Sequence, residues 1–227
     1  MKLVFEKFEA PLSLRRDALN VLRVEDPSLF SRCALSLAQG FPPDALEPAF
    51  FFSDDGREIK ASKILYFAGD LLSLDLNDRR IVAQAIKVVA ERMALEENAG
   101  YALEIINCEM EDIFAEQFVQ MSANYYLADD WDLSKYLKML GFGVDDSEDR
   151  TVYEKLQHFL RISADLFPEK VIAIVNASNY LTDAQYNEFC ELVASLQLCV
   201  LSYEQGLRVA AGHLENVLSI DINYLEK

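Results

Sequence analysis

The chain of 227 residues lacks the features that mark membrane and secreted proteins. No apolar run reaches the roughly 18 residues that a membrane-spanning helix needs. Charge appears at Lys2, Glu6 and Lys7, which is too early for the apolar core of a secretory signal. We therefore expect a cytoplasmic protein without membrane contact.

Close pairs of cysteines are also absent. No two of the four cysteines stand in a C-x-x-C spacing, and three of them fall inside apolar patterns. This usage disfavours a disulfide framework and a zinc site. We predict four buried free thiols, at Cys33, Cys108, Cys190 and Cys199.

Positive charge is scarce, because 21 basic residues face 38 acidic ones and the formal net charge is −17. Taken alone, this charge disfavours nucleic acid, since phosphate binding depends on lysine and arginine replacing counterions. The distribution is uneven, however. Residues 1–92 hold 13 basic and 14 acidic residues, whereas residues 93–227 hold 8 and 24. The near-neutral amino-terminal part can still present a basic surface.

What is present is a large apolar fraction, 52%, which is enough for a real core. The first part of the chain has an α/β pattern. An apolar stretch at 19–24 predicts a strand, and Asp26 stands where it would cap a helix that begins at Pro27. Residues 49–52 and 57–60 lie on either side of an Asp-Gly turn, which indicates a hairpin. Residues 64–67 predict a further strand.

The pattern turns helical between residues 77 and 165. Apolar residues recur at helical spacing from residue 77 to about 126, with a predicted break near 98–100. A short helix is expected over 133–140, and another after Val152. We predict that residues 77–165 form a helical domain.

The α/β pattern then resumes. The continuous apolar run 171–175 is typical of a strand covered on both faces, and residues 182–185 match a capping box that starts a helix. A second buried strand follows at 198–201. Strand, helix and strand imply a parallel crossover. The expected fold is α/β, with one domain built from residues 1–76 and 166–227 and the helical domain inserted in it.

Catalytic or nucleotide-binding residues are hard to find. Ligands of such sheets bind at the carboxyl ends of strands, here 25–28 and 176–178. The segment 24–30 has neither glycine nor lysine, and its two carboxylates would repel a phosphate. His158 and His213 have no recognisable catalytic partner in the sequence. We expect no enzymatic activity.

Acidic residues gather in the second half of the chain. Calcium takes six to eight oxygen ligands, which carboxylates from two loops could supply. Acids at helix starts also stabilise the helix dipole without any metal, and both interpretations stay open. The candidate metal ligands are Asp129, Asp130, Asp132, Asp145, Asp146 and Glu148.

Basic residues in the amino-terminal part are candidates for phosphate contacts. Such contacts would be independent of DNA sequence and would weaken with salt. A merely solvated surface is the alternative. The candidates are Arg15, Arg16, Arg32, Lys60, Lys63, Arg79, Arg80 and Lys87.

Short segments along nearly the whole chain stand in a familiar order. They are Pro11–Arg15, Glu25-Asp26, Leu29–Arg32, Phe51–Asp55, Ile59–Ser62, Asp70–Asp75, Leu140-Gly141 and Ile174–Thr182. In this order they resemble the Csn-two family of type II-A CRISPR-associated adaptation proteins.

The resemblance implies a degenerate P-loop-NTPase-like sheet flanked by helices, without the phosphate loop. It also implies a homotetrameric ring that takes double-stranded DNA through a basic hole, depends on calcium, and acts with the CRISPR integrase complex and the type II effector nuclease in spacer acquisition. A degenerate nucleotide-binding protein and a protein-binding adaptor are the alternatives.

Carried over by position, the resemblance marks Arg15 and Arg32 as basic positions of the family, and Lys60 and Lys63 as part of a basic segment. Arg16 stands where a small residue is expected. For calcium, it points to Asp129, Asp130 and the loop from Asp145 to Asp149. Three positions depart from the acidic pattern that the family implies: Asn124, Tyr125 and Leu127.

Overall fold

A computed structural model describes residues 1–127, 132–148, 151–206 and 214–226. The chain divides into two compact units. An α/β unit contains Met1–Leu76 and Asp146–Lys227, and a helical unit contains Asn77–Asp145.

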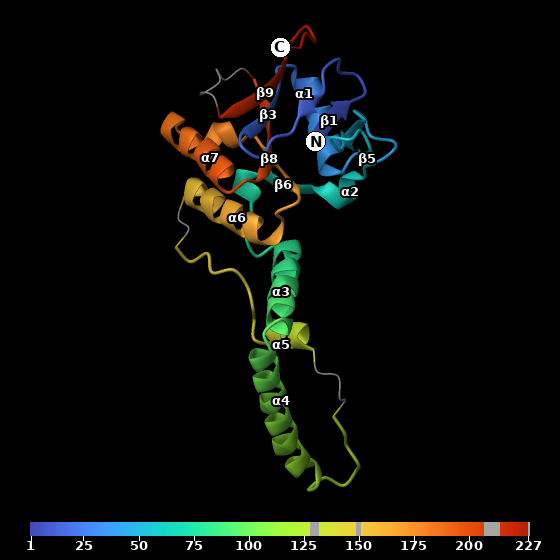
Figure 1. The fold of residues 1–227 in the computed structure, drawn as a ribbon, viewed down its shortest axis with the longest axis vertical. Helices are drawn as coiled ribbons and strands as arrows, with labels where there is room; N and C mark the ends of the chain where they lie inside the picture. Colours follow the sequence, from blue (N-terminus) through green and yellow to red (C-terminus); the bar gives the residue numbers. More distant parts are fainter. Residues whose placement is uncertain (128–131, 149–150, 207–213, 227) are drawn as a thin grey trace. The chain divides into compact units, whose positions relative to one another are not determined.

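The α/β unit is built on a five-stranded sheet in which all neighbouring strands are parallel. Its strands, in spatial order, are β6 (Leu65–Asp70), β7 (Val171–Val175), β8 (Cys199–Gln205), β3 (Leu19–Val24) and β9 (Glu215–Ile220). Strands from both ends of the sequence therefore share one sheet, as predicted (Figure 1).

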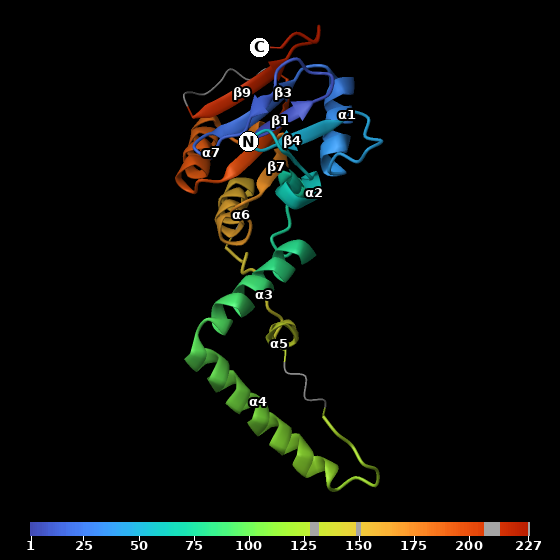
Figure 2. The same cartoon turned by 45° about the vertical axis from the view of Figure 1, so that its right-hand side comes forward.

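Helices cover both faces of this sheet, which confirms the predicted α/β class. Figure 2 shows α1 (Pro27–Ala38) on one side, and α6 (Val152–Leu166) and α7 (Asp183–Ser195) on the other. On the α1 side, the ring of Phe30 stacks on Tyr203 with centroids 4.6 Å apart. On the other side, Tyr186 and Phe189 of α7 are fully buried.

A smaller antiparallel sheet packs beside α1. Its order is β2 (Leu12–Ser13), β1 (Lys2–Phe5), β4 (Ala49–Phe52) and β5 (Glu58–Ile59). Leu3 and Phe51 of this sheet share a core cluster with Leu22 and Leu201 of the large sheet. The chain then passes through α2 (Ala61–Ile64) into β6, and η1 (Leu71–Ser73) follows β6. Later in the chain, η2 (Ala177–Tyr180) follows β7.

Local side-chain signals fix the helix starts. The Asp26 carboxylate accepts a hydrogen bond from the Leu29 amide at 2.7 Å, directly before Pro27. Thr182 and Gln185 form the predicted capping box of α7. Each of these contacts satisfies an amide that the helix itself leaves unpaired, so both predictions are confirmed.

The helical unit contains α3 (Arg79–Ala94), α4 (Glu97–Phe118) and α5 (Leu133–Met139). The predicted break at 98–100 is wrong, because these residues lie inside α4 and the chain turns at Leu95 and Glu96 instead. A single glycine costs only ~1 kcal/mol in a helix and does not have to end it. The Asn77 side chain hydrogen-bonds both the amide and the carbonyl of Val144, at 2.8 and 3.0 Å, at the ends of this unit.

The boundary between the units differs from the predicted one. The predicted helical domain runs to residue 165, but α6 belongs to the α/β unit. Leu156, Phe159 and Leu160 are fully buried, and the Phe159 ring lies 6.1 Å from that of Tyr66 in β6. Helical periodicity identifies an apolar side of a helix, but it does not say which partner covers that side.

The thiols follow the prediction in three of four cases. All four cysteines are free, and Cys33, Cys190 and Cys199 are buried. Burial raises the pKa of Cys33 to about 12 and that of Cys199 to about 11, which keeps both thiols protonated and inert. Cys108 is exposed on α4, so its predicted burial is wrong.

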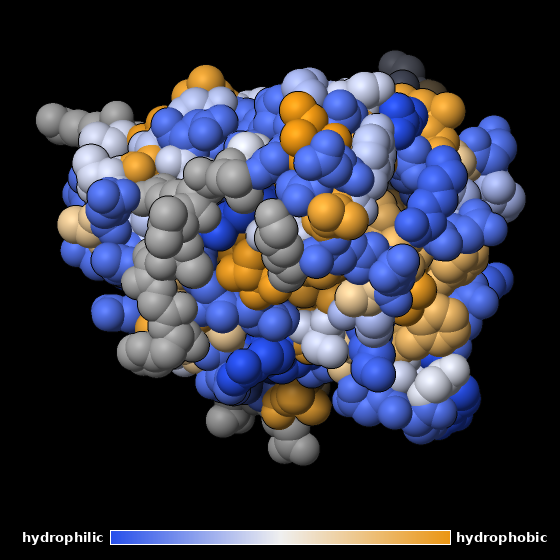
Figure 3. Space-filling model, turned by 90° about the horizontal axis from the view of Figure 1, so that it is seen from above, coloured by the Kyte–Doolittle hydropathy of each residue, from blue (hydrophilic) through white to orange (hydrophobic). Residues whose placement is uncertain are grey.

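Surface hydropathy is mixed. In the view from above, hydrophilic side chains cover most of the visible face and hydrophobic ones form separate patches among them (Figure 3). Among the described helices, we find none both long and apolar enough to span a membrane.

Candidate nucleic-acid interface

The loops that enter the five-stranded sheet bring several predicted cations to one edge of the α/β unit. Parallel strands all begin at the same edge, and Lys63, Arg15 and Arg16 each come shortly before a strand. We call this the amino-terminal edge. Arg16 reaches along it from the segment before β3, because its guanidinium donates to the carbonyl of Pro168 at 2.5 Å and to that of Gln197 at 3.4 Å.

Both arginines at this edge are already engaged with the protein's own acids. Arg15 binds Asp17 through two hydrogen bonds, at 2.9 and 2.7 Å. This contact raises the pKa of Arg15 and lowers the pKa of Asp17. Arg16 binds Glu169 at 3.0 Å. A phosphate would have to compete with these carboxylates.

The two lysines at the edge are different. Lys60 is the N-cap residue of α2, but its side chain makes no capping hydrogen bond. Both Lys60 and Lys63 are exposed. Within the described part of the chain, neither has a carboxylate at ion-pair distance. They are available to an outside anion.

Arg32 lies away from this edge, on α1, which starts where β3 ends. Its guanidinium donates to Glu47 at 2.7 Å and to the Ser28 hydroxyl at 2.8 Å. Glu47 is only 2% exposed and also receives Lys7 at 3.0 Å. The hydrogen bond to Glu47 raises the pKa of Arg32. Arg32 compensates the charge of the buried Glu47 carboxylate. Replacing Arg32 would therefore destabilise the fold as well as affect DNA binding.

The other three predicted cations belong to the helical unit, at the start and middle of α3. Arg80 pairs with the capping residue Asp78 at 3.0 Å, and Lys87 lies 3.8 Å from Glu91. Arg79 is exposed, with no acidic partner within ion-pair distance among the residues described. The structure therefore brings four of the eight candidates to one edge: Arg15, Arg16, Lys60 and Lys63.

One cation at this edge was not among the candidates. Lys170 directly precedes β7, and its ammonium donates to the backbone carbonyl of Lys63 at 2.6 Å. Residues 65 and 171 are paired in the sheet, which explains the contact. Recognising Lys170 from sequence would have required the pairing of β6 with β7.

The opposite edge, where a nucleotide would bind in such a sheet, is occupied by the chain itself. The Asp26 carboxylate takes the amide at the start of α1, and Glu25 accepts a hydrogen bond from the amide of Ile222 at 2.9 Å. The Tyr224 hydroxyl lies 3.5 Å from Asp26. A helix start that already holds a carboxylate is a poor phosphate site.

The predicted calcium ligands do not form a site by themselves. Asp129 and Asp130 lie outside the described residues, and Asp132, Asp145, Asp146 and Glu148 are exposed. Asp132 caps α5 by accepting from the Ser134 amide at 2.8 Å, which lowers the pKa of Asp132. Across the described ranges, no three His, Cys, Asp or Glu side chains gather as a metal would require.

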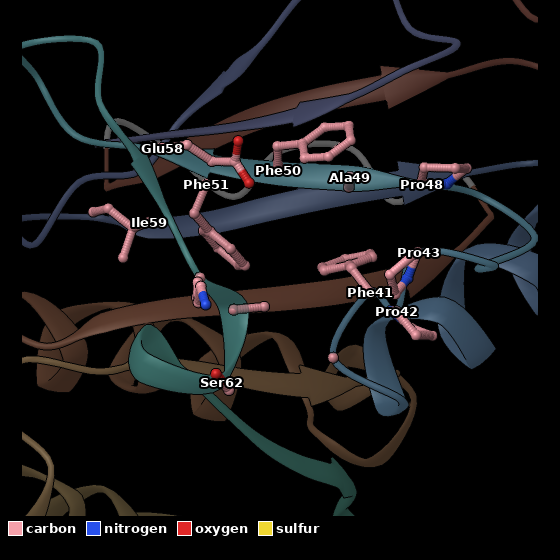
Figure 4. A pocket seen from close by; sticks show the side chains of 13 residues that line it. Phe41, Pro42, Pro43, Pro48, Ala49, Phe50, Phe51, Glu58, Ile59 and Ser62 are labelled. Carbon is pink, nitrogen blue, oxygen red and sulfur yellow. The ribbon is translucent and has the colours of Figure 1, made fainter.

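A cavity of about 370 Å³ lies between β4 and the loop that follows α1. Figure 4 shows Phe51 and Ile59 from the hairpin and Phe41 from the loop around it. Its two charged lining residues, Glu58 and Lys60, are of opposite sign. The apolar walls and balanced charge do not favour a phosphate group.

Comparison with known proteins identifies the family. A family model described as CRISPR-associated protein (Cas_Csn2) matches residues 44–221, well over half of the chain. The chain belongs to this family. The resemblance predicted from the order of segments is therefore confirmed.

A solved structure has a similar fold. The crystal structure of Stu0660 of Streptococcus thermophilus is similar to this chain, with a TM-score of 0.58 and 13% sequence identity. The similarity covers 96% of this chain and 74% of the other. No curated protein matches the sequence.

Proposed function

We propose that this Cas_Csn2 protein is a cytoplasmic, non-enzymatic accessory protein of CRISPR spacer acquisition. Four copies form a ring, and the ring takes the end of a double-stranded DNA through a basic central hole without reading its sequence. Its partners are the CRISPR integrase complex and the type II effector nuclease. Family membership supports the CRISPR association, and the rest of the proposal depends on the features below.

The observation that carries DNA binding is the gathering of Arg15, Arg16, Lys60 and Lys63 at the amino-terminal edge. This edge stands out in a chain of net charge −17. Cations without base-reading geometry contact phosphates, so the binding is expected to ignore sequence.

Apolar side chains exposed on α4 support self-association. Ile113 is 62% exposed and Phe114 is 53% exposed, and Tyr101, Ile105 and Ile106 are exposed on the same helix. Several large apolar side chains exposed on one helix are typical of a site of contact with another protein. In the proposed ring, a second copy covers it.

We propose that the protein is not an enzyme because a carboxylate lies at the carboxyl edge of the sheet, where a nucleotide would bind. If the fold is that of a degenerate P-loop NTPase, the position of its phosphate loop is the Asp26-capped start of α1. A carboxylate in this position would exclude a nucleotide phosphate by charge. The rival proposal, a degenerate nucleotide-binding protein, requires that Asp26 move away.

Linear duplex DNA is expected to bind at low salt, with affinities that agree within about threefold, or ~0.7 kcal/mol, for two unrelated sequences of equal length. The logarithm of the affinity should fall linearly with that of the salt concentration. Fluorescence anisotropy with labelled duplexes measures both. Thermal stabilisation by ATP with magnesium and no DNA binding would favour the rival, and binding of neither would favour a protein-binding adaptor.

Calcium dependence is proposed from the family resemblance. The described acids form no ligand set among themselves, and the resemblance points to Asp129, Asp130 and the loop from Asp145 to Asp149. We propose that Asp129 and Asp130 contribute ligands. Titration calorimetry with calcium is expected to detect binding to the unsubstituted protein and a loss of at least about tenfold, or ~1.4 kcal/mol, in D129N/D130N. Equal heats for the two proteins would refute this assignment.

A further inference from the structure

Three lysines meet at the amino-terminal edge, around the starts of β6 and β7. Lys60 and Lys63 are joined through one turn, in which the Lys63 amide donates to the Lys60 carbonyl at 2.9 Å. Residues three apart in such a turn project to the same side. The ammonium of Lys170 donates to the Lys63 carbonyl at 2.6 Å, so it is held beside that turn.

No carboxylate forms a direct ion pair with these ammonium groups among the described residues, since none lies within 4.0 Å of any of the three. The two acids closest in sequence are Glu58 and Glu169, and Glu169 is bound by Arg16 at 3.0 Å. Three positive charges on neighbouring segments without a paired carboxylate attract an anion.

Their donors are also free to bind. An ammonium has three N–H donors, and Lys170 uses one of them for the Lys63 carbonyl. The two arginines of the same edge use some of theirs on Asp17, Glu169 and backbone carbonyls. Each guanidinium has five N–H donors and keeps some of them unused, but its charge is already paired with a carboxylate. The lysines, which have no such carboxylate, should therefore contribute more to phosphate binding than the arginines.

We infer that Lys60, Lys63 and Lys170 form a binding site for the phosphates of the DNA backbone. The inference builds on the proposed DNA binding and adds where the duplex lies. The duplex runs along the amino-terminal edge of the sheet, opposite the edge at which ligands of parallel α/β sheets usually bind. Lys170 enters the site because β7 pairs with β6.

The test compares two double variants that remove the same charge from the same edge, K63Q/K170Q and R15Q/R16Q. Each phosphate contact contributes about 0.9 to the slope of log affinity against log salt. K63Q/K170Q is expected to lower the steepness of this slope by about two and to weaken binding at ~0.1 M salt by on the order of 10- to 100-fold. R15Q/R16Q should change both much less. K155Q, on α6, serves as the control for a lysine elsewhere in the unit.

Thermal unfolding of each variant checks the fold. If the loss of the Lys170 hydrogen bond unfolds K63Q/K170Q, K60Q/K63Q replaces it, because it leaves that bond intact. If K63Q/K170Q binds DNA as well as the wild type, the inference is overturned. The same holds if R15Q/R16Q weakens binding as much as K63Q/K170Q does. Either result would leave the proposed function itself standing. Absence of DNA binding by the unsubstituted protein would overturn the proposed function and this site with it.

Discussion

Replacing Arg23 by methionine is expected to lower the free energy of unfolding by about 3–5 kcal/mol. Arg23 lies on β3, between β8 and β9 in the large sheet, with a side chain only 4% exposed. Its guanidinium lies 3.2 Å from Glu215, whose side chain is 2% exposed. The substitution removes the Arg23 cation from beside the buried Glu215 carboxylate, and we expect that loss to dominate the effect. Urea denaturation followed by circular dichroism measures it.

The double variant R23M/E215Q separates the ion pair from simple packing. Glutamine keeps an oxygen that accepts the Tyr186 hydroxyl, which donates to Glu215 at 2.6 Å. With both charges removed, most of the lost stability should return. R57M, which breaks the exposed pair with Asp55, should leave unfolding nearly unchanged. If R23M/E215Q is as unstable as R23M, the charge argument is wrong.

The pair is not ideally satisfied in the native state. Among the described residues, the Nε of Arg23 has no hydrogen-bond partner. Burial and the hydrogen bond to Glu215 both raise the pKa of Tyr186, so its hydroxyl stays a donor at neutral pH. A buried pair of this kind contributes little net stability but costs much when it is half removed.

Much of the α/β unit could be predicted from the sequence because its signals are local. The apolar runs 19–24 and 171–175 coincide with β3 and β7, and Asp26 and Thr182 cap the helices that they were predicted to cap. Continuous apolar runs and capping side chains need no knowledge of the partner strand.

The parts that were missed depend on distant contacts. β1 and β2 are only four and two residues long, and they are strands because they pair with β4 and with each other. β9 is a strand because it pairs with β3. The placement of α6 depends on Tyr66, almost a hundred residues away. Such pairings have no signature within a short window of sequence.

In the candidate interface, too, the sequence identified what is local and missed what depends on distant contacts. The sequence identified Arg15, Arg16, Lys60 and Lys63 as candidates by charge alone. It could not predict that Asp17 and Glu169 engage the arginines or that Arg32 is held by Glu47. Those partners come from the folded chain, and they decide which cations can reach a phosphate.

A ring that threads DNA makes a prediction about topology as well as charge. A linear duplex can enter the ring at its end, whereas a covalently closed circle requires that a subunit interface open. The apolar side chains of α4, if buried between copies, make that opening unfavourable. A relaxed closed circle is therefore expected to bind at least about tenfold more weakly than the same DNA cut once, a difference of ~1.4 kcal/mol.

The most direct measurement is a competition in which a labelled linear duplex is displaced by unlabelled circle or by the same circle linearised with one cut. Sequence, length and charge are identical in the two competitors, so only the free end differs. Threading predicts that the linear form competes at least about tenfold better, by ~1.4 kcal/mol, at low salt with calcium. Equal competition by the closed circle would contradict the ring and would leave only binding to the outer surface of the protein.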